Sequence, residues 1–464
     1  MASGASLERN LTGIDRSNAG QGAPKRNAEK DRPTSTCQLA DLIVQASLQA
    51  YHTVCPLELR EAYQQTVLAT IVLQETQGGD NRLQVVALAV GTKVLAADLI
   101  HSSDEAKENR DLALHDMHAE VLARRCFKRV LLEHMQYLLR CPHGASPLLD
   151  YNAVPGLYEI KPSIKLHLYS SSQPCGNACI KRWAKSKRAV VAQGIGMFDL
   201  PPLAHPPFFP TAIPEGETAV LVKTNSRTCT KSEDGVGFSY CPEGTAHVSL
   251  GKGNVMTCSD KMCKWNCVGM QGAALALFMQ PVYVDSITIG RKFCETHARR
   301  ALCCRVSKFA STSACDHVVY QSKHPVLMTS NIKFDTGSVV AEEGAKFTET
   351  RCFAAWRTAN SICVGISADS ADPAVYVKEV LNGSTGLLEA GDVSALSSNR
   401  QLQLTRDIIA SIHSRSGDHV LAARLHDVSI SGGLRELKRQ ARGYQEAKRK
   451  LTSPPFPLAD WICK

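Results

Sequence analysis

A short polar motif, Asp-Met-His-Ala-Glu, occupies residues 116–120. His118 offers an imidazole that can bind a metal ion, and Glu120 offers a carboxylate that can carry protons. A Pro-Cys pair follows at residues 174–175 and adds a thiol. These are the groups that a zinc hydrolase needs, because the metal makes a water nucleophilic near neutral pH and the carboxylate accepts and returns its proton.

The third ligand of such a site is ambiguous in the sequence. Zinc deaminases that act on bases carry H-x-E followed by P-C-x-x-C, but here Cys179 follows Cys175 by four residues. Cys179 can still ligate from further along its helix, or a distant cysteine such as Cys258 can replace it. The alternative without chemistry is a solvated histidine at a helix start and a cysteine packed in the core.

Periodic hydrophobic patterns predict the elements that position these residues. The motif 116–120 opens the clearest helix, whose apolar stripe runs through residues 118–140. Strands and helices alternate along the chain, which predicts an α/β layered domain. The predicted strands are 66–75, 83–97, 164–171 and 282–290, and the predicted helices are 37–52, 118–140, 177–190, 265–279, 295–306 and 432–451.

Composition places the chain among ordinary soluble proteins, with 464 residues, 44% hydrophobic and 21% charged. No apolar run is long enough to span a bilayer. Eighteen cysteines without a secretory signal favour reduced thiols inside the cell, in the nucleus or cytoplasm. The net charge of +9 fits a polyanionic partner without requiring one. Residues 1–36 are expected to be a disordered tail, residues 37–464 the folded domain, and 201–217 a proline-rich loop within a variable insertion at about 200–250.

Five stretches in order resemble one family, the RNA adenosine deaminases with an A-to-I editase domain. They are Gly-Thr-Lys at 91–93, His-Ala-Glu at 118–120, Pro-Cys-Gly-Asn-Ala at 174–178, the 258–273 segment CSDKMCKWNCVGMQGA, and the C-terminal residues 444–448 and 461–464. This family comprises the tRNA-specific adenosine deaminases and the enzymes that edit double-stranded RNA. The 258–273 segment is the most specific of the five.

The resemblance implies a zinc ion held by His118, Cys175 and Cys258, with Glu120 as the proton shuttle and Cys179 as a buried thiol. It also implies a three-layer α/β/α core of the cytidine-deaminase type, with a mixed sheet and a helical C-terminal region. The implied reaction is hydrolysis at C6 of adenine, which releases ammonia and leaves inosine. The base must leave its stack to reach the metal, so a single-stranded or loop substrate lowers the cost.

The family also buries inositol hexakisphosphate beneath its active site, and a polyphosphate can pair many cations at once. A solvated helix face is the alternative reading of the same basic residues. His115 and Leu434 depart from the family pattern, which usually has Asn and often Tyr at these positions. The matching residues here are Arg124, Arg125, Lys261, Lys264, Lys438, Tyr444, Lys448, Trp461 and Lys464.

The expected substrate is tRNA, at the adenosine just 3′ of the anticodon, with alanine tRNA as the family's usual substrate. Only about 80 residues precede the predicted strand at 83–97 that contains Gly-Thr-Lys, which leaves no room for a double-stranded-RNA-binding domain of typical size. Thr92 and Lys93 are expected RNA contacts, and the basic stretch 181–188 is either a backbone contact or an exposed helix face. A monomer without DNA or membrane partners is expected. The alternatives are editing of another structured RNA or messenger RNA, and an inactive RNA-binding homologue.

Overall fold

The computed structural model describes residues 34–63, 66–76, 82–95, 111–141, 146–153, 156–176, 178, 256–312, 318–334, 350–363, 372–414, 419–454, 456 and 458. Three expectations fall outside these residues, wholly or almost wholly. They are residues 1–33 of the expected tail, the helix at 177–190 and the proline-rich loop at 201–217, whereas residues 34–36, also expected in the tail, begin the first helix, Thr34–Val54. The predicted insertion at about 200–250 also lies outside the described residues.

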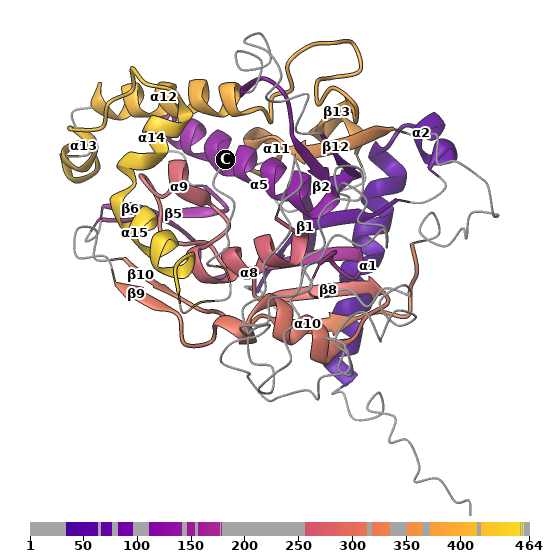
Figure 1. Cartoon of the computed structure of the whole chain (residues 1–464). Coiled ribbons are helices and arrows are strands. Elements are labelled where there is room, and N and C mark those ends of the chain that lie inside the picture. The colour runs from indigo at the N-terminus through magenta and orange to yellow at the C-terminus, as the bar shows by residue number, and fades with distance from the viewer. Residues whose placement is uncertain are drawn as a thin grey trace, which may run out of the picture.

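A seven-stranded mixed sheet lies at the centre of the fold (Figure 1). Its strand order is β11-β8-β7-β1-β2-β12-β13. The neighbours β7, β8 and β11 run parallel, and every other neighbouring pair runs antiparallel. The strands are β1 Leu68–Glu75, β2 Arg82–Val90, β7 Ile164–Ser172, β8 Ser286–Arg291, β11 Val326–Thr329, β12 Arg351–Arg357 and β13 Tyr376–Asn382.

Helices cover both faces of this sheet. The helix α1 (Thr34–Val54) packs on one face through Ile43 and Tyr51, which join Leu88 of β2 in one apolar cluster. The helix α5 (Ala119–Arg140) packs on the other face, where the alternate residue Ala89 belongs to a second cluster. Strand residues alternate between faces, and both faces here are apolar. The three-layer α/β/α core with a mixed sheet is therefore confirmed.

The C-terminal third of the chain adds a helical layer beyond α5, coloured orange to yellow in Figure 1. In it α12 packs on α5, and α15 packs on α8. The predicted single helix at 432–451 is wrong in one respect, because the chain turns at Ala441 and divides it in two. These helices are α12 Ser398–His413, α13 His419–Leu425, α14 Leu434–Gln440 and α15 Arg442–Leu451.

Two other predicted elements are also divided. The strand at 83–97 breaks at Gly91, because β3 (Thr92–Val94) leaves the main sheet to pair with β4 (Asp116–His118). The helix at 265–279 begins earlier, as α8 (Cys258–Val268), and ends where Gly269 adopts a φ of 83°. Such a positive φ is favourable for glycine and costly for other residues. A short helix, α9 (Gly272–Leu275), follows.

The remaining elements are short, and most connect the layers. The predicted helix at 295–306 is confirmed as α10 (Glu295–Leu302) with a 3₁₀ turn, η2 (Cys304–Val306). Among the described residues, no helix is both long enough and apolar enough to cross a bilayer. The others are α2 Leu57–Ala62, β5 Leu149–Asn152, β6 Leu157–Ile160, β9 Ala310–Thr312, β10 Val319–Gln321, α11 Ala359–Cys363 and η4 Pro373–Val375.

Candidate metal centre and basic cluster

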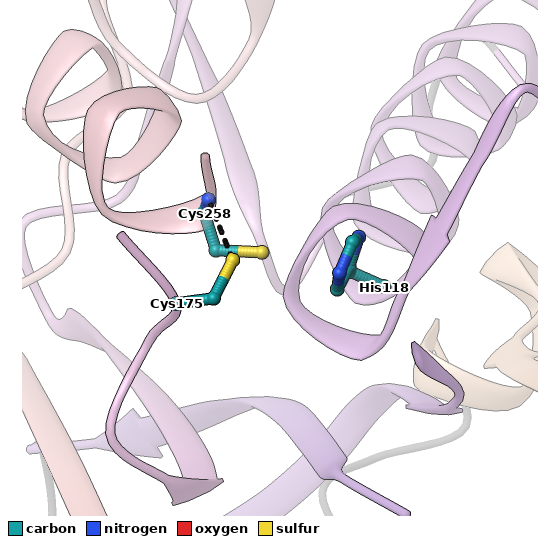
Figure 2. A group of neighbouring side chains, drawn as sticks. All are labelled: His118, Cys175 and Cys258. Atoms are coloured by element: carbon teal, nitrogen blue, oxygen red, sulfur yellow. Dashed lines mark hydrogen bonds between the residues drawn. The ribbon is translucent and has the colours of Figure 1, made fainter. Parts of the chain in front are cut away.

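Three side chains from distant parts of the sequence meet at the N-terminal end of α5. The ligand atoms of His118, Cys175 and Cys258 all lie within 4.8 Å of one another, and Figure 2 shows the two thiols together, across from the imidazole. We call these three residues the thiol–imidazole site. The set of one histidine and two cysteines is one that zinc accepts, with a fourth position left open.

The ends of strands and the starts of helices bring these three residues together. His118 ends β4 and caps α5, while Cys258 is the first residue of α8. Cys175 follows β7, and its Sγ accepts a hydrogen bond from the backbone N–H of Cys258 at 3.4 Å (Figure 2). Gly176, with a φ of +93°, permits this approach, because a Cβ there would lie 2.2 Å from the hydroxyl oxygen of Thr257.

Asp116 orients the imidazole and was not among the predicted site residues. Its carboxylate accepts hydrogen bonds from the backbone N–H of His118 at 3.1 Å and from the ring Nδ1 at 2.7 Å, and Lys261 donates to its other oxygen. Burial alone would raise the pKa of Asp116, but Lys261 and His118 hold it well below its usual range. A carboxylate can only accept, so Nδ1 is the protonated nitrogen and Nε2 is the one available to a metal.

Glu120 lies in the first turn of α5, with 3% of its surface exposed. Ser170 of β7 donates a hydrogen bond to its Oε1 at 3.2 Å. Burial, followed by the nearby Cys175, raises the pKa of Glu120 above its usual value. A carboxyl group with a raised pKa can both accept and return a proton near neutral pH, which is what a proton shuttle requires.

Neighbouring acidic groups raise the pKa of the Cys258 thiol and of the His118 imidazole. The hydrogen bond with Cys175 and burial raise the pKa of the Cys258 thiol far above its usual value, with Glu120 adding to the effect. Burial would lower the pKa of His118, but Asp116, Cys175 and Glu120 raise it to about 9. Crowded, buried acids next to an imidazole form an environment that a divalent cation stabilises. The N-termini of α5 and α8 add positive potential that favours an anionic oxygen there.

A group of cations gathers further along the same two helices and on the C-terminal helices. We call these residues the basic cluster. Arg124 and Lys128 both pack against Gly272, because a Cβ at Gly272 would lie 2.9 Å from Nη2 of Arg124 and 3.9 Å from Cε of Lys128. Lys128 donates to Gln401 of α12 at 2.8 Å, and Arg124 lies over the ring of Trp265 at 5.0 Å. The cluster comprises Arg124, Arg125, Lys128, Lys264, Lys438, Tyr444 and Lys448.

Burial and neighbouring like charges lower the pKa of three lysines of the basic cluster. The pKa of Lys264 falls well below its usual value through burial and then the charge of Arg124. Burial and Arg124 also lower the pKa of Lys128 well below its usual value, and burial together with Arg125 lowers the pKa of Lys438 to about 8. Such a cluster costs free energy unless an anion pairs with it.

The basic cluster overlaps the predicted polyphosphate site without matching it fully. Lys128 was not predicted, although its spacing of four residues from Arg124 places both on one helix face. Lys261 is paired with Asp116, and Arg125 donates to the carbonyl of Leu396 at 3.1 Å. Two residues of the predicted polyphosphate site, Trp461 and Lys464, lie outside the described residues, as does Cys179, which was predicted to be a buried thiol near the metal ligands.

The sequence matches a family model described as the adenosine-deaminase (editase) domain over residues 87–464, which is most of the chain. The chain belongs to this family. Editase deaminases depend on zinc, and the thiol–imidazole site is a group that can hold a metal ion. The matched region contains every described residue of the thiol–imidazole site and of the basic cluster.

Relatives within the editase family differ in how much of each chain is matched. A mouse double-stranded RNA-specific adenosine deaminase is 27% identical over 66% of this chain and 23% of its own length. The chain spans 19% to 33% of the length of five such relatives. Mouse tRNA-specific adenosine deaminase 1 is 24% identical over 82% of this chain and 86% of its own length. A Drosophila melanogaster protein of the same name is 25% identical over 59% and 60%.

The residues predicted to contact RNA lie beside the metal site of this editase domain. Thr92 is exposed and is the partner of His118 in the β3–β4 ladder. Lys93 is the partner of Met117 and is half-buried. Thr92 is therefore at the rim of the site. The side chain of Lys93 also packs closely against Gly383, because a Cβ at Gly383 would lie 2.8 Å from Cγ of Lys93.

Proposed function

We propose that this chain hydrolyses adenosine to inosine in tRNA, at the adenosine immediately 3′ of the anticodon, with alanine tRNA as its substrate. The observation that carries the proposal is the thiol–imidazole site with a buried carboxyl, Glu120, beside it. Family membership adds the reaction class, since a deaminase needs a metal centre and a proton shuttle in one place.

His118, Cys175 and Cys258 would hold the zinc ion. Zinc supplies a Lewis acid that makes water nucleophilic near neutral pH. Glu120 would carry one proton from the attacking water to the ring nitrogen, and then a second proton from the newly added hydroxyl group to the amino group, which leaves as ammonia. Ser170 orients Glu120 through its hydrogen bond at 3.2 Å. Asp116 keeps the imidazole of His118 in one tautomer, so that the ligand nitrogen faces the thiols.

The choice of tRNA rests on the extent of the match. The mouse tRNA-specific relative is matched over most of both chains, whereas the double-stranded-RNA-specific relatives are matched over a minor part of their length. Editing of another structured RNA or messenger RNA is the second candidate, supported by identities of 27% and 30% to two of those relatives, against 24% to the mouse tRNA-specific protein. Thr92 and Lys93 would contact a ribose and a phosphate near the flipped base.

We also propose that inositol hexakisphosphate binds the basic cluster. Two observations support a polyanion there. The pKa values of Lys128 and Lys264 are both lowered, and Nε of Arg124 is buried without a hydrogen-bond partner. Phosphate oxygens accept several charge-assisted hydrogen bonds at once, so one polyphosphate can satisfy many cations. Trp461 and Lys464 would complete the site from the C-terminus.

The compartment that we infer is intracellular, in the nucleus or cytoplasm. Buried cysteines such as Cys126, Cys258 and Cys263 are thiols in this structure, and thiols remain reduced inside the cell. Two thiols, Cys175 and Cys258, are the proposed zinc ligands, which a disulfide would remove.

Purified protein incubated with alanine tRNA tests the function. Inosine, read by mass spectrometry of nuclease digests, is expected only at the adenosine 3′ of the anticodon. A tRNA with guanosine at that position and a Glu120→Gln variant serve as controls, and both should yield no inosine. A double-stranded RNA incubated in parallel distinguishes the second candidate. Inosine in the duplex but not in tRNA would overturn the proposed substrate, and inosine in neither would overturn the proposed activity.

A further inference from the structure

A second group of two thiols and an imidazole lies away from the thiol–imidazole site. Cys303 directly follows α10, Cys304 begins η2, and His324 lies between β10 and β11. Their ligand atoms all lie within 4.8 Å of one another. Among the described residues, this set and the thiol–imidazole site are the two groups that could hold a metal ion.

The distances in this second group match those of a tetrahedral zinc site. The two sulfur atoms of Cys303 and Cys304 are 3.7 Å apart, and Sγ of Cys304 is 3.7 Å from Nδ1 of His324. Two sulfurs bound to one tetrahedral zinc at about 2.3 Å lie about 3.8 Å apart. The donor atoms therefore need little movement to share one ion.

The backbone holds both halves of the group against α8. The side-chain amide of Asn266 donates to the carbonyl of Leu302 at 2.9 Å, just before Cys303. The carbonyl of Asn266 accepts the N–H of Lys323 at 2.8 Å, just before His324. One residue of α8 thus fixes the two segments that carry the ligands, and Figure 1 shows α10 alongside α8.

Burial and access are both suited to a bound ion. Cys303 and Cys304 are 1% and 2% exposed, whereas His324 is exposed. His324 lines an open hollow of about 560 Å³ that also includes Tyr283 and Lys323. An ion can enter from this side, and a water can supply the fourth ligand.

We propose that Cys303, Cys304 and His324 form a second, structural zinc site. Binding would release the two thiol protons and leave two thiolates and a neutral imidazole on the ion. The ion would link α10 to the loop before β11, closing a chain segment between residues 304 and 324. Since soft thiolate ligands favour Zn²⁺ or Cu⁺, zinc is the probe for the test.

Zinc content measured by mass spectrometry after exhaustive dialysis tests the proposal. The background is the Cys258→Ser variant, which lacks a ligand of the first site, so its zinc reports the second site alone. About one zinc per chain is expected in this variant, and His324→Ala added to it should reduce that to near zero. The matched control is His413→Ala, another exposed histidine, which should leave the zinc content unchanged.

A second measurement keeps the result independent of folding and of RNA chemistry. With cobalt in place of zinc, the Cys258→Ser variant should show sulfur-to-cobalt absorption in the near ultraviolet, and Cys304→Ser added to it should remove that absorption. A Cys258→Ser variant that unfolds cooperatively but holds no zinc would overturn the second site. Mass-spectrometric detection of a disulfide between Cys303 and Cys304 would also overturn it. Deamination by His324→Ala at the wild-type rate is expected, which separates this site from the proposed function.

Discussion

The thiol–imidazole site and the basic cluster share two helices but gather groups of opposite charge. The helix α5 gives Glu120 to the first and Arg124 to the second, one turn later. The helix α8 gives Cys258 to the first and Lys264 to the second. Position along the helix separates the two regions, since helix starts favour negative groups and the sides of helices do not.

Crowding has opposite effects on the pKa in the two regions. At the thiol–imidazole site, burial and the neighbouring Cys175 raise the pKa of Glu120. In the basic cluster, burial and the neighbouring Arg124 lower the pKa of Lys264. Like charges that are buried together cost free energy unless a counter-ion pairs with them. The difference agrees with the two ligands proposed for these regions, a small dication for the first and a polyanion for the second.

Lys261 lies between the two regions and connects them. It pairs with Asp116, which holds His118, and it is one helical turn from Lys264. The metal site is thus supported from the side of the basic cluster. Changes in the first region should abolish chemistry, and changes in the second should act on stability.

Replacing a proposed ligand should have the largest effect. The Cys258→Ser variant should lose deamination of tRNA below detection and lose the zinc of the thiol–imidazole site, since three protein ligands hold that ion. Inosine formation and zinc content measure the two losses. Cys179→Ser is the matched control and should keep both, which would decide the choice that the spacing of Cys175 and Cys179 leaves open. Zinc loss in the control would show that Cys179 is a ligand.

Removing the proton shuttle should separate chemistry from metal binding. The Glu120→Gln variant keeps the size of the side chain, and we expect kcat to fall by ~10²–10⁴-fold, the usual contribution of general acid–base catalysis. Zinc content should remain that of the wild type. A variant with near-normal kcat would contradict the role of Glu120.

Weakening the support of His118 should have an intermediate effect. Asp116→Asn removes the charge that fixes the imidazole and pairs with Lys261, and such changes typically cost about 10–100-fold in metal affinity or activity. Zinc affinity, measured by competition with a chelator, should fall together with kcat. Asp150→Asn, at an exposed ion pair with Lys161, is the control and should change neither.

Removing a cation from the basic cluster should reduce stability rather than chemistry. The Lys448→Ala variant should lose about 2 kcal/mol of unfolding free energy, because it would remove a charge-assisted hydrogen bond to the proposed polyphosphate. The control, Arg449→Ala, changes the next residue of α15, which is exposed. Denaturant unfolding measures both, and equal stability of the two variants would argue against a bound polyphosphate.

Much of this arrangement could be predicted from local motifs, whereas the part that depends on contacts between residues distant in sequence could not. The helix at 118–140 and the layered α/β fold followed from hydrophobic periodicity, and His118, Cys175 and Cys258 from motif resemblance. Asp116 was missed, although residues two apart on a strand share one face and His118 lies two positions later. Its other partner, Lys261, is 145 residues away, and no local pattern shows that contact. The break at Ala441 was missed because the amphipathic pattern continues through it.

The smallest expected effect is a pH dependence that depends on the counter-ion. Without the polyphosphate, Lys438 has a pKa of about 8 in the folded protein, below its ordinary value of 10.5. The unfolded chain then binds more protons between these two values, so the contribution of Lys438 to stability rises with pH over that range. Once the polyphosphate has been stripped, Lys438→Met should be more stable than the wild type at pH 7.5, by no more than about 2 °C in Tm. That advantage should disappear by pH 10.

With the polyphosphate bound, the sign should reverse. The anion favours the charged form of Lys438, so Lys438→Met should then be less stable than the wild type at pH 7.5. Thermal unfolding of both proteins, before and after the polyphosphate is stripped, measures the reversal. An advantage of the variant in both states would mean that Lys438 has no anionic partner. The basic cluster would then be a set of repelling charges, and its contrast with the metal site would have to be explained without a polyanion.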